Sequence, residues 1–154
     1  MFLLTLTTHS LLRWLALAFG LIAVVRALVG VLTRQPWTPS DDRAGRLFVI
    51  AFDVQALVGL VLYFFLSPIT QHALSNMGSA MTDPVTRYWA VEHIALMILA
   101  LGMVHLGRAR SRRATTDAAK HRSAAIFYTL GFVAMVAATP WPFMPAGRPL
   151  LPTL

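Results

Sequence analysis

The chain has 154 residues, of which 57% are hydrophobic and only 12% are charged, and its formal net charge is +7. A soluble domain normally carries about 25% charged residues, so this composition argues against a soluble globular protein. The chain has no cysteine. That excludes disulfides, thiolate metal sites, iron–sulfur clusters and covalently attached haem, but leaves haem that is held by histidine.

Four apolar stretches predict four membrane-spanning helices in a single domain, residues 1–154. Roughly 20 apolar residues are needed to cross the hydrocarbon core of a bilayer. The predicted spans are residues 8–32, 47–66, 89–107 and 121–139, followed by a proline-rich tail, residues 140–154. The first span is interpreted as a retained helix rather than a signal peptide, because no basic residue precedes Arg13 and the apolar run is too long.

Proline and capping residues predict where these helices begin and end. Pro36 and Pro39 stop the first helix from continuing into the first loop. The Ser-Pro pair at 67–68 ends the second helix, Thr-Asp-Pro at 82–84 is typical of a helix start, and Thr116 can cap the fourth helix. Since every connection is short, consecutive helices should be antiparallel neighbours. The expected fold is all-α, an up-down-up-down four-helix bundle with the first and third helices diagonally opposed.

The basic residues predict how this bundle is oriented. Nine of them lie between the first and second spans or between the third and fourth: Arg34, Arg43, Arg46, Arg108, Arg110, Arg112, Arg113, Lys120 and Arg122. The positive-inside rule places these loops in the cytoplasm and both termini outside, in the periplasm, for a multi-pass protein of the bacterial inner membrane. The run GRARSRR at 107–113 is also expected to meet anionic lipid headgroups of the bilayer. Nucleic-acid binding is not favoured, because the charge follows the loops.

Two histidines begin apolar spans at the expected outer surface. His9 begins the first span and His93 begins the third, so both should lie at similar depth. The residues within roughly 40° of the His9 face are Arg13, Ala16, Gly20, Ala23 and Ala27. Diagonal helices can supply two imidazoles to non-covalent haem b, with Arg13 pairing a propionate. Alternatively, the small residues serve close packing and the polar ends contact water or neighbouring groups.

Other ionisable residues suggest further pairs. Arg26 and Asp53 lie at comparable depths on adjacent helices, so we expect an ion pair between them, either as a structural clasp or as part of a proton relay or quinone-site wall. Glu92 is expected to pair with Arg87 or Arg13, or to mark an interface with another subunit. The roles of His105 and His121, near the opposite ends of the third and fourth spans, stay open between interface residues and ligands of a second haem.

Five motifs carry a resemblance to a known family. They are HSLLRW at 9–14, DVQALVGLVLYFFLSP at 53–68, RYWAVEHIALM at 87–97, GRARSRRATTDAAKHR at 107–122 and PWPF at 140–143. Together they resemble a family of small four-span bacterial membrane proteins that are often labelled cytochrome B. The resemblance implies a b-type haem and a role in membrane electron transfer, with His9 and His93 as matching ligands and His121 as the next candidate.

Two classes of function follow from these observations. The first is a small b-type-cytochrome-like protein, a haem-binding or quinone-linked electron-transfer subunit that uses His9, His93 and Arg13. The second is a non-catalytic accessory or structural subunit of a larger membrane complex. Under either interpretation, a chain of this size is expected to associate with other membrane subunits or to form a homo-oligomer.

Overall fold

The protein is all-helical in the computed structural model, which describes residues 1–151 and contains no strand among them. Two of its helical segments, η1 and η2, are π-helical. The elements in chain order are α1 (Phe2–Thr33), α2 (Pro39–Val61), η1 (Leu62–Leu66), α3 (Pro68–Ser75), α4 (Met77–Thr82), α5 (Pro84–Arg87), η2 (Tyr88–Glu92), α6 (His93–Arg113) and α7 (Asp117–Ala137). The predicted fold class is therefore confirmed at the level of secondary structure.

Side-chain caps start α5 and α7 at the predicted signals, Thr-Asp-Pro at 82–84 and Thr116, whereas α2 starts at Pro39, eight residues before the predicted position 47. Thr38 and Asp41 form a reciprocal capping box at the start of α2, which satisfies backbone donors that the first helical turn leaves open. Thr116 caps α7 in the same way that Asp83 caps α5, each accepting from a backbone N–H three residues later. Hydrogen bonds from the hydroxyl and the backbone N–H of Thr86 lower the pKa of Asp83 below its ordinary value.

Three of the described helices are long and apolar enough to cross a membrane. They are Phe2–Thr33, Pro39–Leu66 and Pro84–Arg113, the last two being continuous through η1 and η2. The third begins several residues before the predicted position 89, because the Asp83 cap and Pro84 start the helix earlier. The predicted fourth span corresponds to α7, whose first turns are polar (Asp117, Lys120 and Arg122).

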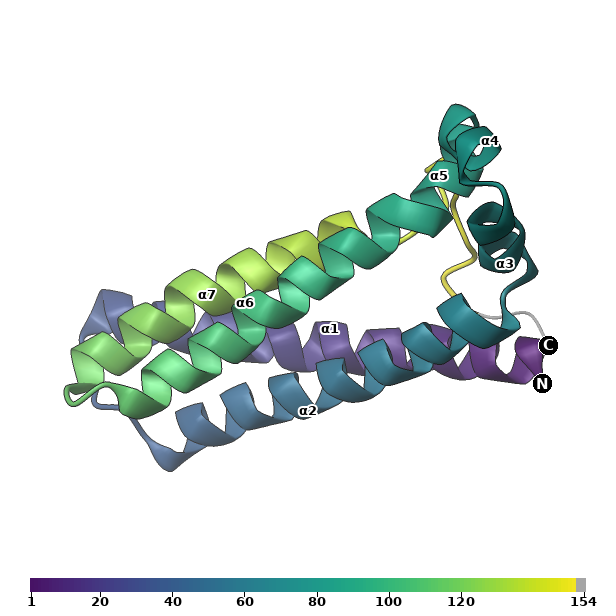
Figure 1. Ribbon diagram of the computed structural model, residues 1–154. Helices are drawn as coiled ribbons and strands as arrows, with labels where there is room; N and C mark the ends of the chain where they lie inside the picture. The colour runs from purple at the N-terminus through teal and green to yellow at the C-terminus, as the bar shows by residue number, and fades with distance from the viewer. Residues whose placement is uncertain (152–154) are drawn as a thin grey trace.

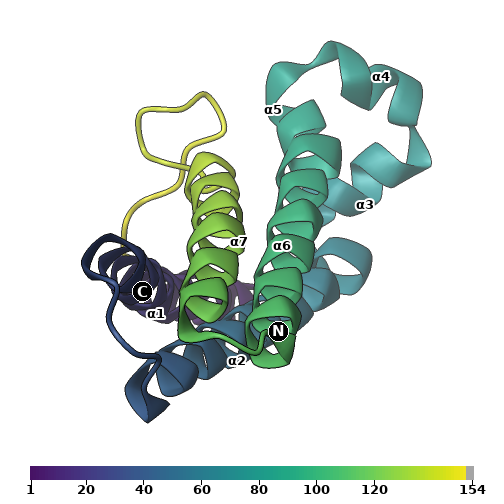
Figure 2. The ribbon, with the colours of Figure 1, turned by 90° about the vertical axis from the view of Figure 1, so that its left-hand side faces the viewer.

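Each of the four long helices packs against two others. The neighbouring pairs are α1 with α2, α2 with α6, α6 with α7, and α7 with α1. Consecutive long helices run in opposite directions, and the view from one end shows how α1, α2, α6 and α7 lie around a common centre (Figures 1 and 2). Helices α1 and α6 are therefore diagonally opposed. The short helices α3, α4 and α5 cover one end of the molecule (Figure 1).

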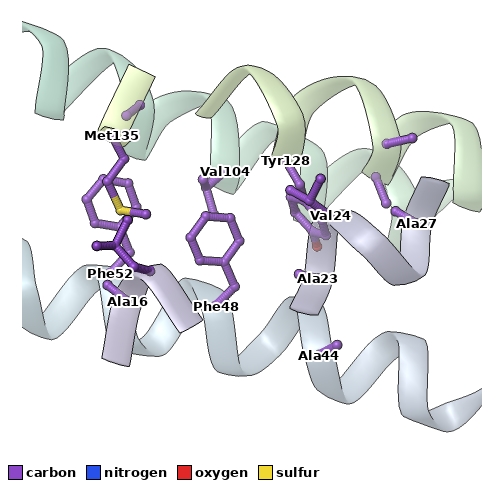
Figure 3. Close-up of a cluster of buried hydrophobic side chains, with 14 residues drawn as sticks. Ala16, Ala23, Val24, Ala27, Ala44, Phe48, Phe52, Val104, Tyr128 and Met135 are labelled. Atoms are coloured by element: carbon purple, nitrogen blue, oxygen red, sulfur yellow. The ribbon is translucent and has the colours of Figure 1, made fainter. Parts of the chain in front are cut away.

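The core combines aromatic side chains of α2 with small residues of α1. Phe48 and Phe52 are fully buried and stack with ring centroids 6.1 Å apart, and Tyr128 of α7 meets Phe48 edge-on at 5.8 Å. Ala16 and Ala23 face these rings from α1 (Figure 3). Large apolar side chains also cover much of the outer surface, among them Leu15, Ile22, Leu57, Ile98, Leu130 and Val133. This outward apolar surface is what a lipid environment requires.

The predicted ion pair between Arg26 and Asp53 is wrong. Arg26 instead pairs with Asp41 in the first turn of α2 at 2.9 Å, and Asp53 pairs with His105 of α6 at 2.7 Å. Arg26 and Asp53 do lie on neighbouring helices, α1 and α2. The side chain of Asp53, however, faces α6 rather than α1. The long arginine side chain extends toward the start of α2, where Asp41 is already fixed by its cap with Thr38.

We predict that Gly30→Ala destabilises the protein, because a Cβ there would collide with the imidazole of the buried His121. Overpacking of this kind costs about 1–3 kcal/mol, measured as the free energy of unfolding in detergent. In a His121→Ala background, Gly30→Ala should cost less free energy of unfolding than it does in the wild-type protein, because the colliding ring is gone. Gly102→Ala is the matched control, since a Cβ there meets nothing within 4 Å. Equal effects at both glycines would contradict the prediction.

Candidate functional site

A cavity of about 160 Å³ lies between the long helices at the end covered by α3. Residues from α1, α2, η1, α3, η2, α6, α7 and the tail line it, and most of its wall is apolar. Its polar or basic lining residues are His9, Ser10, Arg13, Gln55, Tyr63, Ser67, Thr70, Trp89, His93, Thr139 and Arg148. The structure thus brings the three predicted site residues His9, Arg13 and His93 to one cavity.

His93 is oriented by a hydrogen bond through the ring nitrogen Nδ1. This atom lies 2.8 Å from the backbone oxygen of Ala138. Because a carbonyl oxygen only accepts, Nδ1 carries the hydrogen, and in the neutral imidazole Nε2 carries the lone pair. The rings of Tyr88 and Trp89 pack against the imidazole with centroids 5.8 and 5.5 Å away. A histidine held in this way is typical of metal ligands, whose second nitrogen donates to a carbonyl or carboxylate.

His9 has a different environment. Its Nε2 lies 3.2 Å from Nε2 of Gln55, while its Nδ1 is buried with no hydrogen-bond partner in the described structure. The Oε1 atom of Gln55 is also buried and unpartnered. Gly59 makes room for the ring, since a Cβ at this position would lie 2.9 Å from Cε1 of His9. Buried polar atoms without partners are uncommon, so this wall of the cavity has hydrogen-bonding capacity that a ligand can use.

Two arginines give the cavity a positive charge. Arg13 is only 8% exposed; its Nη2 donates to the backbone oxygen of Leu150 at 2.8 Å, and its Nε has no partner in the described structure. Arg148 lies over the ring of Trp89 at 5.3 Å and also lines the cavity. No aspartate or glutamate lines the cavity among residues 1–151. A buried charge needs a partner, so this arrangement favours a ligand with an anionic group.

The two π-helical segments meet beside this cavity. The hydroxyl of Tyr63 in η1 donates to the backbone oxygen of Ala90 in η2 at 2.7 Å. Thr70 of α3 in turn donates to the backbone oxygen of Tyr63 at 2.8 Å. A π turn leaves a backbone carbonyl without its usual α-helical donor, and such turns are frequent at functional sites. Here the side chains of neighbouring elements supply the missing donors and hold the two helices together at the cavity wall.

The donor set fits a b-type haem, whereas the volume is smaller than a porphyrin requires. Among the described residues no group of three or more histidine, cysteine or acidic side chains could hold a metal ion, but a haem iron needs only two protein ligands in addition to its porphyrin. Pockets for drug-sized ligands measure roughly 300–1,000 Å³. Haem binding therefore requires outward movement of α3 or the tail around the 160 Å³ cavity.

The remaining predicted residues lie outside this cavity. Glu92 pairs with Arg87 at 2.7 Å, one of its two expected partners. His105 pairs with Asp53 on the surface of α2 and α6. His121 is buried beside Trp37, with ring centroids 4.8 Å apart, and neither ring nitrogen has a partner in the described part of the chain. His105 and His121 thus have separate surroundings, and the structure does not assemble them into a second haem site.

Three residues that line the cavity were not predicted as site residues: Gln55, Gly59 and Arg148. Gln55 could have been predicted, since it is a polar amide within an apolar span. The tail residue Arg148 could not, because the tail is irregular and carries no periodic pattern. No protein-family model, curated protein or solved structure matches this chain.

We predict that Arg13 fastens the tail to α1. The backbone oxygen of Leu150 accepts from both Arg13 Nη2 and Trp14 Nε1, and a hydrogen bond to a charged group contributes about 1.5–3 kcal/mol. Arg13→Gln should therefore increase amide hydrogen exchange in residues 141–151 roughly tenfold or more. Arg110→Gln is the control, because Arg110 contacts Phe127 far from the tail. Unchanged exchange in Arg13→Gln would show that other contacts hold the tail.

Proposed function

We propose that the chain is an integral protein of the bacterial inner membrane, with its four long helices crossing the bilayer as an up-down-up-down four-helix bundle and both termini outside. The apolar outer surface of these helices supports this arrangement. So does the clustering of charge at the opposite end from α3, where Arg26 pairs with Asp41 and Arg108 binds both carboxylate oxygens of Asp42 at 2.6 and 3.0 Å. Charged groups of this kind belong at the cytoplasmic interface.

We further propose that the cavity lined by His9, Arg13 and His93, here called the outer cavity, binds haem b. The protein would then be a membrane electron-transfer subunit. The observation that carries this proposal is the lining itself: two imidazoles from diagonal helices and two arginines, with no acidic side chain among the described lining residues. His9 and His93 would be the residues that hold the haem iron. Arg13 and Arg148 would pair with the propionates, which satisfies the positive charge of the cavity.

The chain's own residues would prepare the site in three ways. The Ala138 carbonyl fixes the ring of His93 so that Nε2 carries the lone pair. The amide of Gln55, turned so that its oxygen accepts from Nε2–H of His9, would leave the lone pair of His9 on Nδ1. Apolar walls exclude water, which strengthens the electrostatic contribution of Arg13 and Arg148. Bound haem would supply reversible one-electron transfer at its iron.

A second candidate is a non-catalytic accessory subunit of a larger membrane complex, or of a homo-oligomer. The end of the molecule around α3, α4 and α5 favours it, because the buried apolar cluster found there among the described residues consists of three alanines, Ala73 of α3, Ala80 of α4 and Ala90 of η2. Several large apolar side chains at the same end are exposed, among them Leu74, Met77, Met81 and Phe143. A partner subunit would cover such a surface.

We predict a sharp b-type band in the dithionite-reduced minus oxidised absorption spectrum of protein purified from its native membrane. The band should be lost in His9→Ala and in His93→Ala and retained in His72→Ala, whose side chain is exposed in α3 outside the cavity. Circular dichroism on each variant confirms that the helices remain folded. A spectrum without the band in the wild-type protein, or with it intact in both cavity variants, would leave the accessory-subunit proposal as the better one.

The orientation has its own test, because the chain contains no natural cysteine. Single substitutions Ser79→Cys in α4 and Thr115→Cys between α6 and α7 both lie at exposed positions. A membrane-impermeant maleimide should label the first in intact spheroplasts and the second only after lysis, because the two positions would face opposite sides of the membrane. The reverse labelling pattern would mean that the termini are cytoplasmic.

A further inference from the structure

The outer cavity is open on one side of the bundle. Among the described residues that line it, only Leu60 of α2 and Ile98 of α6 are exposed, by 37% and 59%, whereas the others are buried or partly buried. Helices α2 and α6 are neighbours, so both exposed positions belong to the same side. The cavity therefore reaches the outer surface between α2 and α6.

A polar contact between the two helices lies at each end of this opening. Toward α3, the hydroxyl of Tyr63 donates to the backbone oxygen of Ala90 at 2.7 Å. Toward the other end, Asp53 pairs with His105 at 2.7 Å. Between these two contacts, no hydrogen bond within residues 1–151 joins the two helices, which diverge toward α3 (Figure 1). The opening is thus framed by polar contacts and has none across its middle.

The opening lies at the depth of the hydrocarbon core in the proposed membrane arrangement. Ile98 is at the middle of the continuous 30-residue helix Pro84–Arg113. The other residues that α6 contributes to the lining below His93 are apolar as well: Ile94, Met97 and Leu101. A molecule that passes between α2 and α6 must therefore be dissolved in the bilayer.

The positive charge of the cavity belongs to other walls. Arg13 comes from α1 and Arg148 from the tail, and neither α2 nor α6 contributes an arginine or lysine to the described lining. Arg13 is 8% exposed, and its Nε has no partner in the described structure. No acidic side chain lines the cavity within residues 1–151. The cavity is therefore amphipathic, with apolar residues at the opening and unbalanced positive charge beyond them.

We propose that the outer cavity takes its ligand from the bilayer through the opening between α2 and α6, and that this ligand is a carboxylate carried on an apolar body. The carboxylate pairs with Arg13 and Arg148, and the apolar body occupies the opening beside Leu60 and Ile98. A fatty acid has this chemistry, and its chain can extend from the 160 Å³ cavity into lipid. Haem b has it too, through its propionates. The inference rests on the proposed membrane arrangement and does not require haem.

Photolabelling tests the chemistry of the ligand. Palmitic acid with a diazirine midway along its chain is added to the protein in phosphatidylcholine nanodiscs, and labelled peptides are identified by mass spectrometry. We expect label in residues 56–60 and 94–101. Arg148→Gln should decrease it roughly tenfold, because a charge-assisted contact is lost. Arg110→Gln is the matched control, since Arg110 lies over Phe127 much as Arg148 lies over Trp89 but outside the cavity.

The matching diazirine alcohol, which has no carboxylate, separates binding from partition into the bilayer. It should label the same peptides as weakly as the acid labels Arg148→Gln. Equal labelling by the acid and the alcohol, or label spread evenly over the outer faces of all four long helices, would overturn the proposal.

A second variant tests the opening itself. Ala56 lines the cavity one turn before Leu60 on α2, and residues four apart on a helix share a side. Ala56→Trp should therefore fill the opening and abolish the carboxylate-dependent label in residues 94–101. Ala95→Trp is the matched control, at an exposed position of α6 that does not line the cavity. Circular dichroism checks the fold, and Leu60→Trp replaces a variant that does not fold. Unchanged labelling in the plugged protein would overturn the opening as the route of entry.

Competition with haem b identifies the source of the carboxylate. Haem that displaces the photoreactive acid is the ligand, whereas acid that stays bound in excess haem and is recovered from the native protein identifies a fatty acid. The haem proposal fails separately: carboxylate-dependent label without a b-type absorption band supports the opening and rejects haem. A b-type band that is unchanged in Ala56→Trp, together with no carboxylate-dependent label, keeps haem and overturns the present proposal.

Discussion

Close approach of α1 to its neighbours is the constraint on which the rest of the structure depends. The buried side of this helix consists mainly of small residues, including Ala16, Gly20, Ala23 and Ala27. Aromatic rings occupy the space that they leave, since a Cβ on Gly20 would collide with Phe48 of α2 and with α7. Van der Waals packing of this kind is the main force between helices in lipid, where burial of apolar surface adds little. The outer cavity lies where this small-residue surface gives way to His9 and Arg13.

The helices and the small-residue face of α1 were predictable because both are periodic. Apolar length, proline and capping residues located the helices, and a rotation of 100° per residue placed Arg13, Ala16 and Ala23 on one side. The same counting placed His9 and His93 at similar depth, and the structure has both at one cavity. The partner of Asp53 was not predictable in this way. Whether a side chain of α2 faces α1 or α6 depends on how all four helices rotate against one another, which one helix alone does not determine.

The contribution of the tail to the site was also not predictable from the sequence, because the tail is irregular. The Ala138 carbonyl, which orients His93, and Arg148 belong to the segment that follows α7. Their positions depend on contacts across the whole molecule, such as the hydrogen bond from Arg13 to the Leu150 carbonyl. Polar groups of the tail therefore complete a site whose predicted residues all come from helices. The cavity therefore combines a wall made by helices with a wall made by the irregular tail.

The π turns η1 and η2 have a consequence for how the chain tolerates insertions and deletions. Each π turn contains about one residue more than α-helical geometry needs. Loss of one residue within η1 or η2 can convert the turn to α-helix and leave the register on both sides nearly intact. Loss of one residue elsewhere rotates everything beyond it by about 100° and turns the buried face outward. Each of these two helices therefore has a point where its length can change by one residue without rearranging the core around Phe48 and Phe52.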